Sequence, residues 1–462
     1  MIRKDDVILA QDQYYSTDCK KTLINNNVLV VGTAGCGKTR SIVSPNILQA
    51  SGSYVISDPK GLLYKKYSRY LGRQGYDIKV VDFVHPETSD GYNFFRYIRS
   101  TKDIIKVSHM LMACSSEGKK SVADPFWDEA AEILLSALIA YLWEIRPEKE
   151  RNLHKVLQLL AACDVNESDA NDKTTLDYLF EEVRKKKPRS FAVSQYDKFR
   201  RGAGRTLRSV LIVLGTKLGR YDYKEIQEMT SEDSMNMARI GCRKTAVFVI
   251  VSDKDRSMDG LANMFFSQTM DELCRYADDR CENGELPVPV RFIMDDFATN
   301  CVIADFPRMI ASIRSRRIST MLMVQTESQL EEYYGKDGRT IIGNSDTYIY
   351  MGGNDLETAR AVAARCDLPL KKILYMPVGT NWIFRRGQLP VNGVNFDLEA
   401  FEREKNPRTV RIAENTEIKS VEKAKVEENL PKQMETKRKT PNELDEERFS
   451  EYLEDMKKKI AG

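Results

Sequence analysis

The sequence has few of the residues that build metal centres or disulfide frameworks. Its 462 residues include nine cysteines, none in a CxxC spacing, and only three histidines. Zinc sites need clustered Cys and His ligands, so this class of site is disfavoured, and unpaired cysteines fit a reducing cytosol. The 71 Lys and Arg nearly cancel the 68 Asp and Glu. The whole-chain charge therefore gives no argument for a polyanionic partner, and any nucleic-acid surface must be local.

Long hydrophobic runs are also missing. The most apolar stretch, residues 133–143, is flanked by Glu132 and Glu144, and it is much shorter than the roughly 20 apolar residues that a membrane-spanning helix needs. It is typical of a buried core helix. The start, MIRKDDVILAQDQYY, has no apolar segment of the kind found in secretory signals. We therefore expect the protein to stay inside the cell, with any membrane attachment peripheral or through a partner.

Short β-branched runs alternate with helical patterns along much of the chain. This alternation predicts an α/β protein with a mostly parallel sheet whose crossover helices cover both faces. The predicted strands are residues 28–31, 54–57, 78–81, 246–252, 290–294, 319–325 and 347–351.

The alternation stops in the middle of the chain and again near its end. Residues 101–235 have helical patterns, which predicts an all-α domain inserted between two parts of a nucleotide-binding domain, residues 1–100 and 236–400. Asp124 and Pro125 suit the start of its first long helix. Residues 401–462 are charged and poor in aromatics, so we expect a disordered tail with a possible helix at 442–460.

The strongest local motif is GTAGCGKT at residues 32–39. It follows the apolar strand VLVV and precedes a helical run, which is the context of a phosphate-binding P-loop. Backbone N–H groups and the helix dipole would hold the phosphates, Lys38 would reach the β and γ phosphates, and the Thr39 hydroxyl would bind Mg²⁺. The alternative is a glycine-rich turn with a solvated lysine. The predicted ATP-binding residues are Gly32, Thr33, Ala34, Gly35, Cys36, Gly37, Lys38, Thr39 and Arg40.

A P-loop needs a carboxylate at the end of a nearby strand, and VRFIMDD ends in two. Asp295 is predicted on the metal side, and Asp296 as the general base for the attacking water. The alternative is that both aspartates cap the following turn.

Several motifs together resemble the TraG/VirD-type family of type IV secretion coupling proteins, in the family's order and spacing from about Asn26 to Met351. They are GTAGCGKT, YVISDPKG, YNFF, DPFWDEAAEILLSALIAYL, AVFVIVSDKD, IMDDFAT, ASIRSRRIST, VQTESQL and NSDTYIYMGG. The resemblance implies a RecA-like P-loop ATPase with an inserted all-α domain, working with ATP and Mg²⁺ as a homo-hexameric ring. It also implies DNA, a relaxase and the secretion channel proteins as partners, at the cytoplasmic face of the bacterial plasma membrane.

The resemblance assigns two further residues. Gln325 matches the glutamine that senses the γ-phosphate, and an amide can orient a water without adding charge. Arg314 resembles the arginine that reaches a neighbour's ATP in the ring. Arg316 and Arg317 are its rivals, and all three could instead form a solvated basic edge. An ordinary polar strand end is the alternative for Gln325.

The sequence departs from the family at three points. Asp296 stands where glutamate is usual, which suggests slower hydrolysis or a relay water. Phe94 stands where a proline is common, which puts only a local turn in doubt. Family members usually begin with transmembrane helices, and this chain has none. A separate membrane anchor subunit, or a truncated reading frame, would account for that.

Two basic clusters in the helical region are candidates for DNA binding, although solvated loops are the alternative. One is RKKKPR at 184–189, and the other is KFRRGAGRTLR at 198–208, with Tyr196 and Phe199 interleaved. The named DNA-binding residues are Lys198, Arg200, Arg201, Arg205 and Arg208.

Three functions remain open from the sequence. The first is a motor that pumps single-stranded DNA with its relaxase, or a protein, to the channel. The second is a recruitment platform with weak turnover, which the shorter Asp296 carboxylate keeps open. The third is an FtsK-type translocase outside secretion, against which the helical insert argues.

Overall fold

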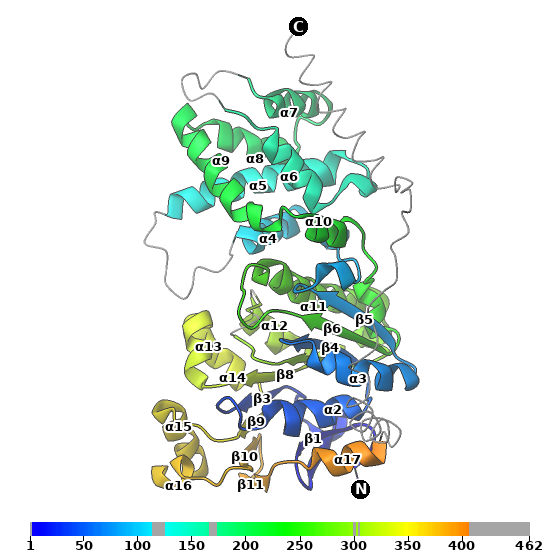
Figure 1. Cartoon of the computed structure of the whole chain (residues 1–462), viewed down its shortest axis with the longest axis vertical. Helices are drawn as coiled ribbons and strands as arrows, with labels where there is room; N and C mark the ends of the chain where they lie inside the picture. Colours follow the sequence, from blue (N-terminus) through cyan, green and yellow to red (C-terminus); the bar gives the residue numbers. More distant parts are fainter. Residues whose placement is uncertain (1, 113–124, 166–172, 299–301, 304, 406–462) are drawn as a thin grey trace, which may run out of the picture. The chain divides into compact units, whose positions relative to one another are not determined.

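The computed structural model describes residues 2–112, 125–165, 173–298, 302–303 and 305–405 (Figure 1). The chain forms two compact units. The first contains residues 1–124 and 217–398, and the second contains residues 125–216 and 399–462.

The first unit is built on a nine-stranded sheet with the order β11-β10-β9-β3-β8-β7-β4-β6-β5. All neighbours from β9 to β5 run parallel. These strands are β3 (Val28–Val31), β4 (Ser53–Asp58), β5 (Asp77–Asp82), β6 (Thr245–Ile250), β7 (Val290–Met294), β8 (Ile318–Val324) and β9 (Thr347–Tyr350). Each overlaps a predicted strand, so the predicted fold class is confirmed.

The parallel strands form because their residues suit burial on both faces. Every residue of β3, β4, β6, β7, β8 and β9 is buried. Their Val, Ile, Phe and Met side chains favour the pleated backbone and pack under the crossover helices. The sheet therefore places the residues that follow each parallel strand along one carboxyl edge.

Four strands were not predicted from the sequence. β1 (Asp6–Ala10) and β2 (Gln13–Ser16) form a separate antiparallel pair. β10 (Thr380–Arg385) runs antiparallel to β9, and β11 (Val391–Val394) runs antiparallel to β10. Because β10 starts and β11 ends at the carboxyl edge of β9, the residues just before β10 and just after β11 return to that edge.

Helices of the first unit connect these strands. They are α1 (Cys19–Thr22), α2 (Ser44–Leu48), α3 (Leu62–Arg73), α4 (Thr101–Met112), α10 (Lys224–Ser231), α11 (Asp259–Arg280), α12 (Phe306–Ser312), α13 (Glu327–Tyr334), α14 (Gly338–Gly343), α15 (Leu356–Cys366) and α16 (Leu370–Leu374). Within the described ranges, no helix is long and apolar enough to cross a bilayer.

The second unit is helical throughout its described part. Its helices are α5 (Pro125–Ile145), α6 (Leu153–Ala161), α7 (Thr175–Lys186), α8 (Phe191–Arg200), most of α9 (Gly204–Leu218) and all but the first residue of α17 (Leu398–Lys405). The predicted core helix is confirmed, since Leu134, Leu138 and Leu142 on α5 are fully buried. The rings of Phe180 and Tyr196 stack with centroids 4.0 Å apart in this core. Side-chain caps at Asn152, Thr174 and Ser190 start α6, α7 and α8.

The unit boundaries lie inside the predicted limits of the helical insert, residues 101 and 235, because α4 and α10 belong to the first unit. Asp124, the predicted cap of α5, and the tail from residue 406 onward lie outside the described residues. The helix α17 (Leu398–Lys405) continues past residue 401, where the tail was predicted to begin. For residues 401–405 the predicted disorder is therefore wrong.

Candidate functional site

The loop at residues 32–38 connects β3 to a helical turn. Gly35 and Gly37 have φ angles of 80° and 96°, in the left-handed region that glycine adopts without a steric cost. Within the described part of the chain, no hydrogen bond uses the backbone N–H of either glycine. A single π-helical turn, Thr39–Val43, then leads into α2. The loop thus presents free N–H donors at the start of a helix, as an anion-binding loop requires.

Lys38 is held against the loop itself. Its ammonium nitrogen lies 2.6 Å from the Gly32 carbonyl oxygen and 3.1 Å from the Thr33 carbonyl oxygen, and only 7% of the residue is exposed. An ammonium group has three donors, so one remains after these two bonds. The positive charge is therefore fixed beside the free N–H groups.

Thr39 and Asp295 meet across the sheet, although β8 separates their strands. The Thr39 hydroxyl donates to Asp295 Oδ2 at 2.7 Å. Burial raises the pKa of the Asp295 carboxyl, and the hydrogen bond from Thr39 opposes that rise. The carboxylate and the hydroxyl provide oxygen ligands for a cation. A cation bound there would offset the free-energy cost of burying the negative charge of Asp295.

Asp296 follows directly and is half-buried. Its φ angle is 53°, and that of Ala298 is 67°; Asp tolerates this left-handed backbone better than Ala does. No hydrogen bond of the Asp296 side chain is found among the described residues. Among the described residues, the Asp296 carboxylate thus lies beside Asp295 without a hydrogen-bond partner.

Gln325 lies next to the first residue of the loop. It follows β8, and Val324 at the end of β8 accepts a hydrogen bond from the Gly32 N–H at 3.1 Å. The side chain is half-buried and makes no hydrogen bond within the described ranges. Lys38, Thr39, Asp295, Asp296 and Gln325 thus all lie at the carboxyl edge of the sheet.

The three arginines before β8 lie at the opposite, amino edge and differ in their contacts. Arg316 makes two hydrogen bonds to the Asp278 carboxylate, at 2.8 and 2.7 Å. Arg317 donates to the carbonyl oxygens of Leu286 and Pro287, at 2.9 and 3.0 Å. Arg314 is exposed, and its side chain has no ion pair or hydrogen bond to any described residue. The structure therefore separates Arg314 from its two rivals.

Arg314 lines an open hollow of about 860 Å³ at this amino edge. Arg291, which is 9% exposed and bonds Ser319 Oγ at 3.3 Å, contributes to its wall. β8 has seven residues, which span about 23 Å. Arg314 therefore cannot reach a phosphate held by the loop of its own chain.

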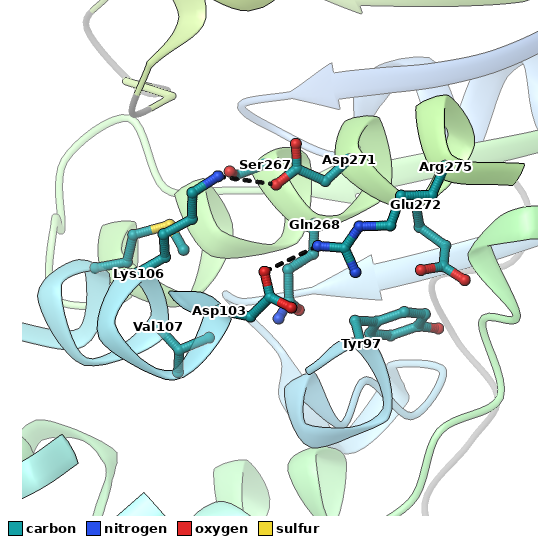
Figure 2. Close-up of a pocket in the computed structure, with 10 residues that line it drawn as sticks. Tyr97, Asp103, Lys106, Val107, Ser267, Gln268, Asp271, Glu272 and Arg275 are labelled. Atoms are coloured by element: carbon teal, nitrogen blue, oxygen red, sulfur yellow. Dashed lines mark hydrogen bonds and ion pairs between the residues drawn. The ribbon is translucent and has the colours of Figure 1, made fainter. Parts of the chain in front are cut away.

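A second pocket shows a different kind of charge arrangement. Figure 2 shows α4 and α11 joined by ion pairs, with Asp103 bound to Arg275 at 2.9 Å and Lys106 to Asp271 at 3.3 Å. Its volume is about 10 Å³, room for about one water. Since the charges satisfy one another, this cluster joins two helices and is not a ligand site.

The loop has two further contacts that the sequence did not reveal. The Gly352 carbonyl, after β9, accepts from the Thr33 N–H at 3.1 Å. The Asn395 side chain, after β11, donates to the Cys36 carbonyl at 3.3 Å. Both residues follow strands of the same edge, but only the Gly352 position follows a predicted strand. No local pattern marks Asn395.

The predicted DNA-binding cluster is only partly available. Arg200 forms an ion pair with Asp177 at 2.9 Å. Tyr196 and Phe199 are buried, so their suggested role as interleaved surface aromatics is wrong; their spacing follows the apolar face of α8. Lys198, Arg201, Arg205 and Arg208 remain exposed.

Comparison with known proteins agrees with this architecture. A model of the family described as type IV secretory system conjugative DNA transfer matches residues 2–366. No curated protein sequence matches the chain. The structure of plasmid coupling protein TrwB with ADP and Mg²⁺ is 15% identical, with a TM-score of 0.62, and the match covers 86% of this chain and 89% of that one. The trigonal form of the bacterial conjugative coupling protein TrwB with sulphate is 16% identical, with a TM-score of 0.59 and coverage of 80% and 85%.

These likenesses show a shared fold, and the family model covers most of the chain. The resemblance found in the sequence is therefore confirmed. The chain belongs to the type IV secretory system conjugative DNA transfer family.

Proposed function

We propose that this protein is a P-loop ATPase that binds and hydrolyses MgATP to deliver DNA to a type IV secretion channel. The contact between Thr39 Oγ1 and Asp295 Oδ2, at 2.7 Å, carries this proposal. It joins the predicted phosphate loop to the predicted metal-side carboxylate, which are far apart in the sequence. A solvated glycine turn would not need that partner.

The residues fit a magnesium nucleotide. Within the described ranges, no group of three or more His, Cys, Asp and Glu side chains could hold a metal by itself. Mg²⁺ is usually held by one or two protein oxygens together with phosphate oxygens and water, and bound Mg²⁺ offsets phosphate charge during phosphoryl transfer. Thr39 and Asp295 supply that protein share. The 15% identical TrwB structure with ADP and Mg²⁺ supports the same ligand class.

The remaining residues of the carboxyl edge are assigned to the attacking water. Asp296 accepts its proton, since this carboxylate has no other partner in the described part of the chain. Gln325 orients the water or contacts the γ-phosphate from the end of β8. Lys38 balances charge on the β and γ phosphates. These roles use side chains that the structure brings to one edge.

We place Arg314 in the active site of a neighbouring copy. The Arg314 side chain has no partner in the part of the chain that the structure describes, and it lies at the amino edge, about one strand length from its own loop. A guanidinium that reaches the phosphates of the next subunit would neutralise charge on the transferred γ-phosphoryl group. This assignment implies a ring, and we propose a homo-hexamer.

The proposed partners follow from family membership. They are single-stranded DNA with its relaxase, the channel proteins and a separate membrane anchor subunit, with the motor at the cytoplasmic face of the plasma membrane. On this chain, Lys198, Arg201, Arg205 and Arg208 are exposed basic side chains that suit sequence-tolerant phosphate contacts.

A recruitment platform with little turnover is the second candidate. The observation in its favour is Asp296, whose carboxylate is one methylene shorter than the glutamate usual in the family. A shorter side chain leaves the base farther from the water. Bound nucleotide would then serve mainly to assemble the subunits.

ATP hydrolysis by the purified protein, with and without single-stranded and double-stranded DNA at stated salt, distinguishes these functions. A motor acting as a ring predicts stimulation by DNA that rises cooperatively with protein concentration. Nucleotide binding without DNA-stimulated turnover would favour the platform. Absence of nucleotide binding would reject both.

A further inference from the structure

The family match ends at residue 366, yet the chain beyond it returns to the phosphate loop. Gly379 precedes β10 and Asn395 follows β11, and the Asn395 N–H donates to the Gly379 carbonyl at 2.8 Å. This closes the β10–β11 hairpin at the carboxyl edge. A segment outside the matched region therefore contacts the part of the molecule to which we assign the nucleotide.

The Asn395 side chain uses both ends of its amide there. Its Nδ2 donates to the Cys36 carbonyl at 3.3 Å, and its Oδ1 accepts from Asn381 Nδ2 at 3.0 Å. Asn381 is fully buried on β10. Two consecutive hydrogen bonds thus connect Asn381, inside the hairpin, through Asn395 to the loop.

The contact fixes one peptide plane. The bond between Cys36 and Gly37 is trans, so its C=O and N–H point in opposite directions. Because Asn395 holds the Cys36 carbonyl, the Gly37 N–H must point away from Asn395. That N–H has no hydrogen-bond partner among the described residues. Gly37 has a φ of 96°, and because glycine lacks a β-carbon it adopts this and many other backbone conformations, so Gly37 alone does not fix the peptide.

We propose that Asn395 is a positioning residue that keeps the Gly37 N–H directed at the phosphates of the bound nucleotide. The proposal rests on the function proposed above. Asn395 itself contacts the loop and not the ligand. Without Asn395, the Cys36–Gly37 peptide would sample orientations in which the Gly37 N–H no longer points at the phosphates. Nucleotide binding would then include the free-energy cost of ordering that peptide.

The hairpin is anchored well enough to act in this way. The Gln11 N–H, in the turn between β1 and β2, donates to the Val394 carbonyl at 2.9 Å. The Asp397 N–H donates to Gln11 Oε1 at 3.2 Å. Asn395 therefore lies between two fixed residues, and Gly393 leaves room for Asn381, since a β-carbon there would come within 2.8 Å of the Asn381 amide oxygen.

The test compares nucleotide affinity with stability in the full chain. Asn395→Asp keeps the size of the side chain and the acceptor for Asn381 but cannot donate to Cys36, and Asn395→Ala removes both bonds. We expect the Kd for MgADP, measured by calorimetric titration, to rise about 3- to 10-fold in the Ala variant. The Asp variant should weaken further because it adds negative charge near the phosphates. Tm without nucleotide should stay within about 2 °C of wild type in the Asp variant.

Asn392→Ala is the matched control, since Asn392 is an exposed asparagine of β11 whose side chain makes no hydrogen bond to any described residue. It should leave Kd unchanged. Wild-type affinity retained in both Asn395 variants would overturn the positioning role while leaving the proposed function intact. A parallel loss of Tm and affinity in both variants would also overturn it, because Asn395 would then serve only folding. If wild-type protein itself fails to bind MgADP, the proposed function fails first.

Discussion

The two edges of the parallel sheet show opposite arrangements of charge. At the carboxyl edge, Lys38, Thr39 and Asp295 are bonded to the loop or to each other, whereas the side chains of Asp296 and Gln325 make no hydrogen bond to any described residue. At the amino edge, the neighbours of Arg314 are tied to backbone carbonyls or to Asp278, and Arg314 is exposed. The carboxyl edge gathers the groups that we assign to the nucleotide, and at the amino edge the Arg314 side chain has no carboxylate partner among the described residues. This difference agrees with our proposal that the amino edge of one copy supplies Arg314 to the nucleotide site at the carboxyl edge of a neighbouring copy.

The largest effect on ATP hydrolysis should come from removing the positive charge of Lys38 at the carboxyl edge. We expect Lys38→Ala to abolish ATP hydrolysis, at least 100-fold, because charge on the phosphates is no longer balanced. The fold should persist, since Gly32 and Thr33 remain bonded to Val324 and Gly352 through their backbones. A steady-state ATPase assay and circular dichroism would show this. Lys60→Ala, which alters an exposed ion pair with Asp253 after β4, is the control, and unchanged hydrolysis in Lys38→Ala would reject the site.

The next effect tests whether the amino edge works in a neighbour. Arg314→Ala should lower the ATPase rate about 100-fold or more while leaving the Kd for nucleotide nearly unchanged. Arg316→Ala should change the rate only a few fold, because Arg316 already pairs with Asp278. Mixing Arg314→Ala with Lys38→Ala protein should restore part of the activity, as some interfaces then join an intact loop to an intact arginine. No recovery on mixing, at concentrations where wild type is active, would contradict sharing between copies.

The smallest effect concerns stability at the carboxyl edge. Burial raises the pKa of Asp295 above its ordinary value of 3.8, so the folded state binds its proton more tightly than the unfolded state. That contribution to stability is present at low pH and is lost as the pH rises through the folded pKa. Asp295→Asn removes the cost of the buried charge, and we expect its Tm without nucleotide to exceed wild type by about 2–4 °C at pH 7.

Thermal unfolding followed by circular dichroism between pH 4 and pH 8 would measure this. The difference in Tm should shrink as the pH falls, because the wild-type carboxyl then takes up its proton. A variant that is less stable than wild type at pH 7 would show that the carboxylate stabilises the fold through Thr39, contrary to our prediction. The same variant should bind MgADP more weakly, since stability and function oppose each other at such a site.

The sequence predicts the parallel half of the molecule better than its ends. Six of the seven parallel strands are buried along their whole length and are rich in β-branched and apolar residues, and the edge strand β5 keeps the apolar pair Val80 and Val81. β10 and β11 read TNWIFR and VNGV, and most of their residues are partly or fully exposed. Polar residues on an exposed edge hairpin give no such pattern, so these strands are recognisable only from their pairing.

The same difference divides the site residues into those that the sequence predicts and those that it does not. Lys38, Thr39 and Asp295 belong to local motifs whose spacing reflects one loop or one strand end. The choice among three arginines depends on Asp278 and on carbonyls of another segment, and the Asn395 contact joins residues at distant positions in the chain. Such partners are set by the tertiary fold. A single sequence contains no local record of them.

The reversed direction of β10 and β11 has a consequence for how this molecule can vary. In a purely parallel sheet, only residues that follow a strand lie at the carboxyl edge. A reversed pair adds one residue that precedes a strand and one that follows the next, while the turn between the strands lies at the far edge. Arg386 bonds Leu23 and Asp346, but residues 387–390 can change in length and composition without altering the register at the nucleotide edge. Diversity among relatives should accumulate in that turn, and the two flanks of the hairpin should remain constrained.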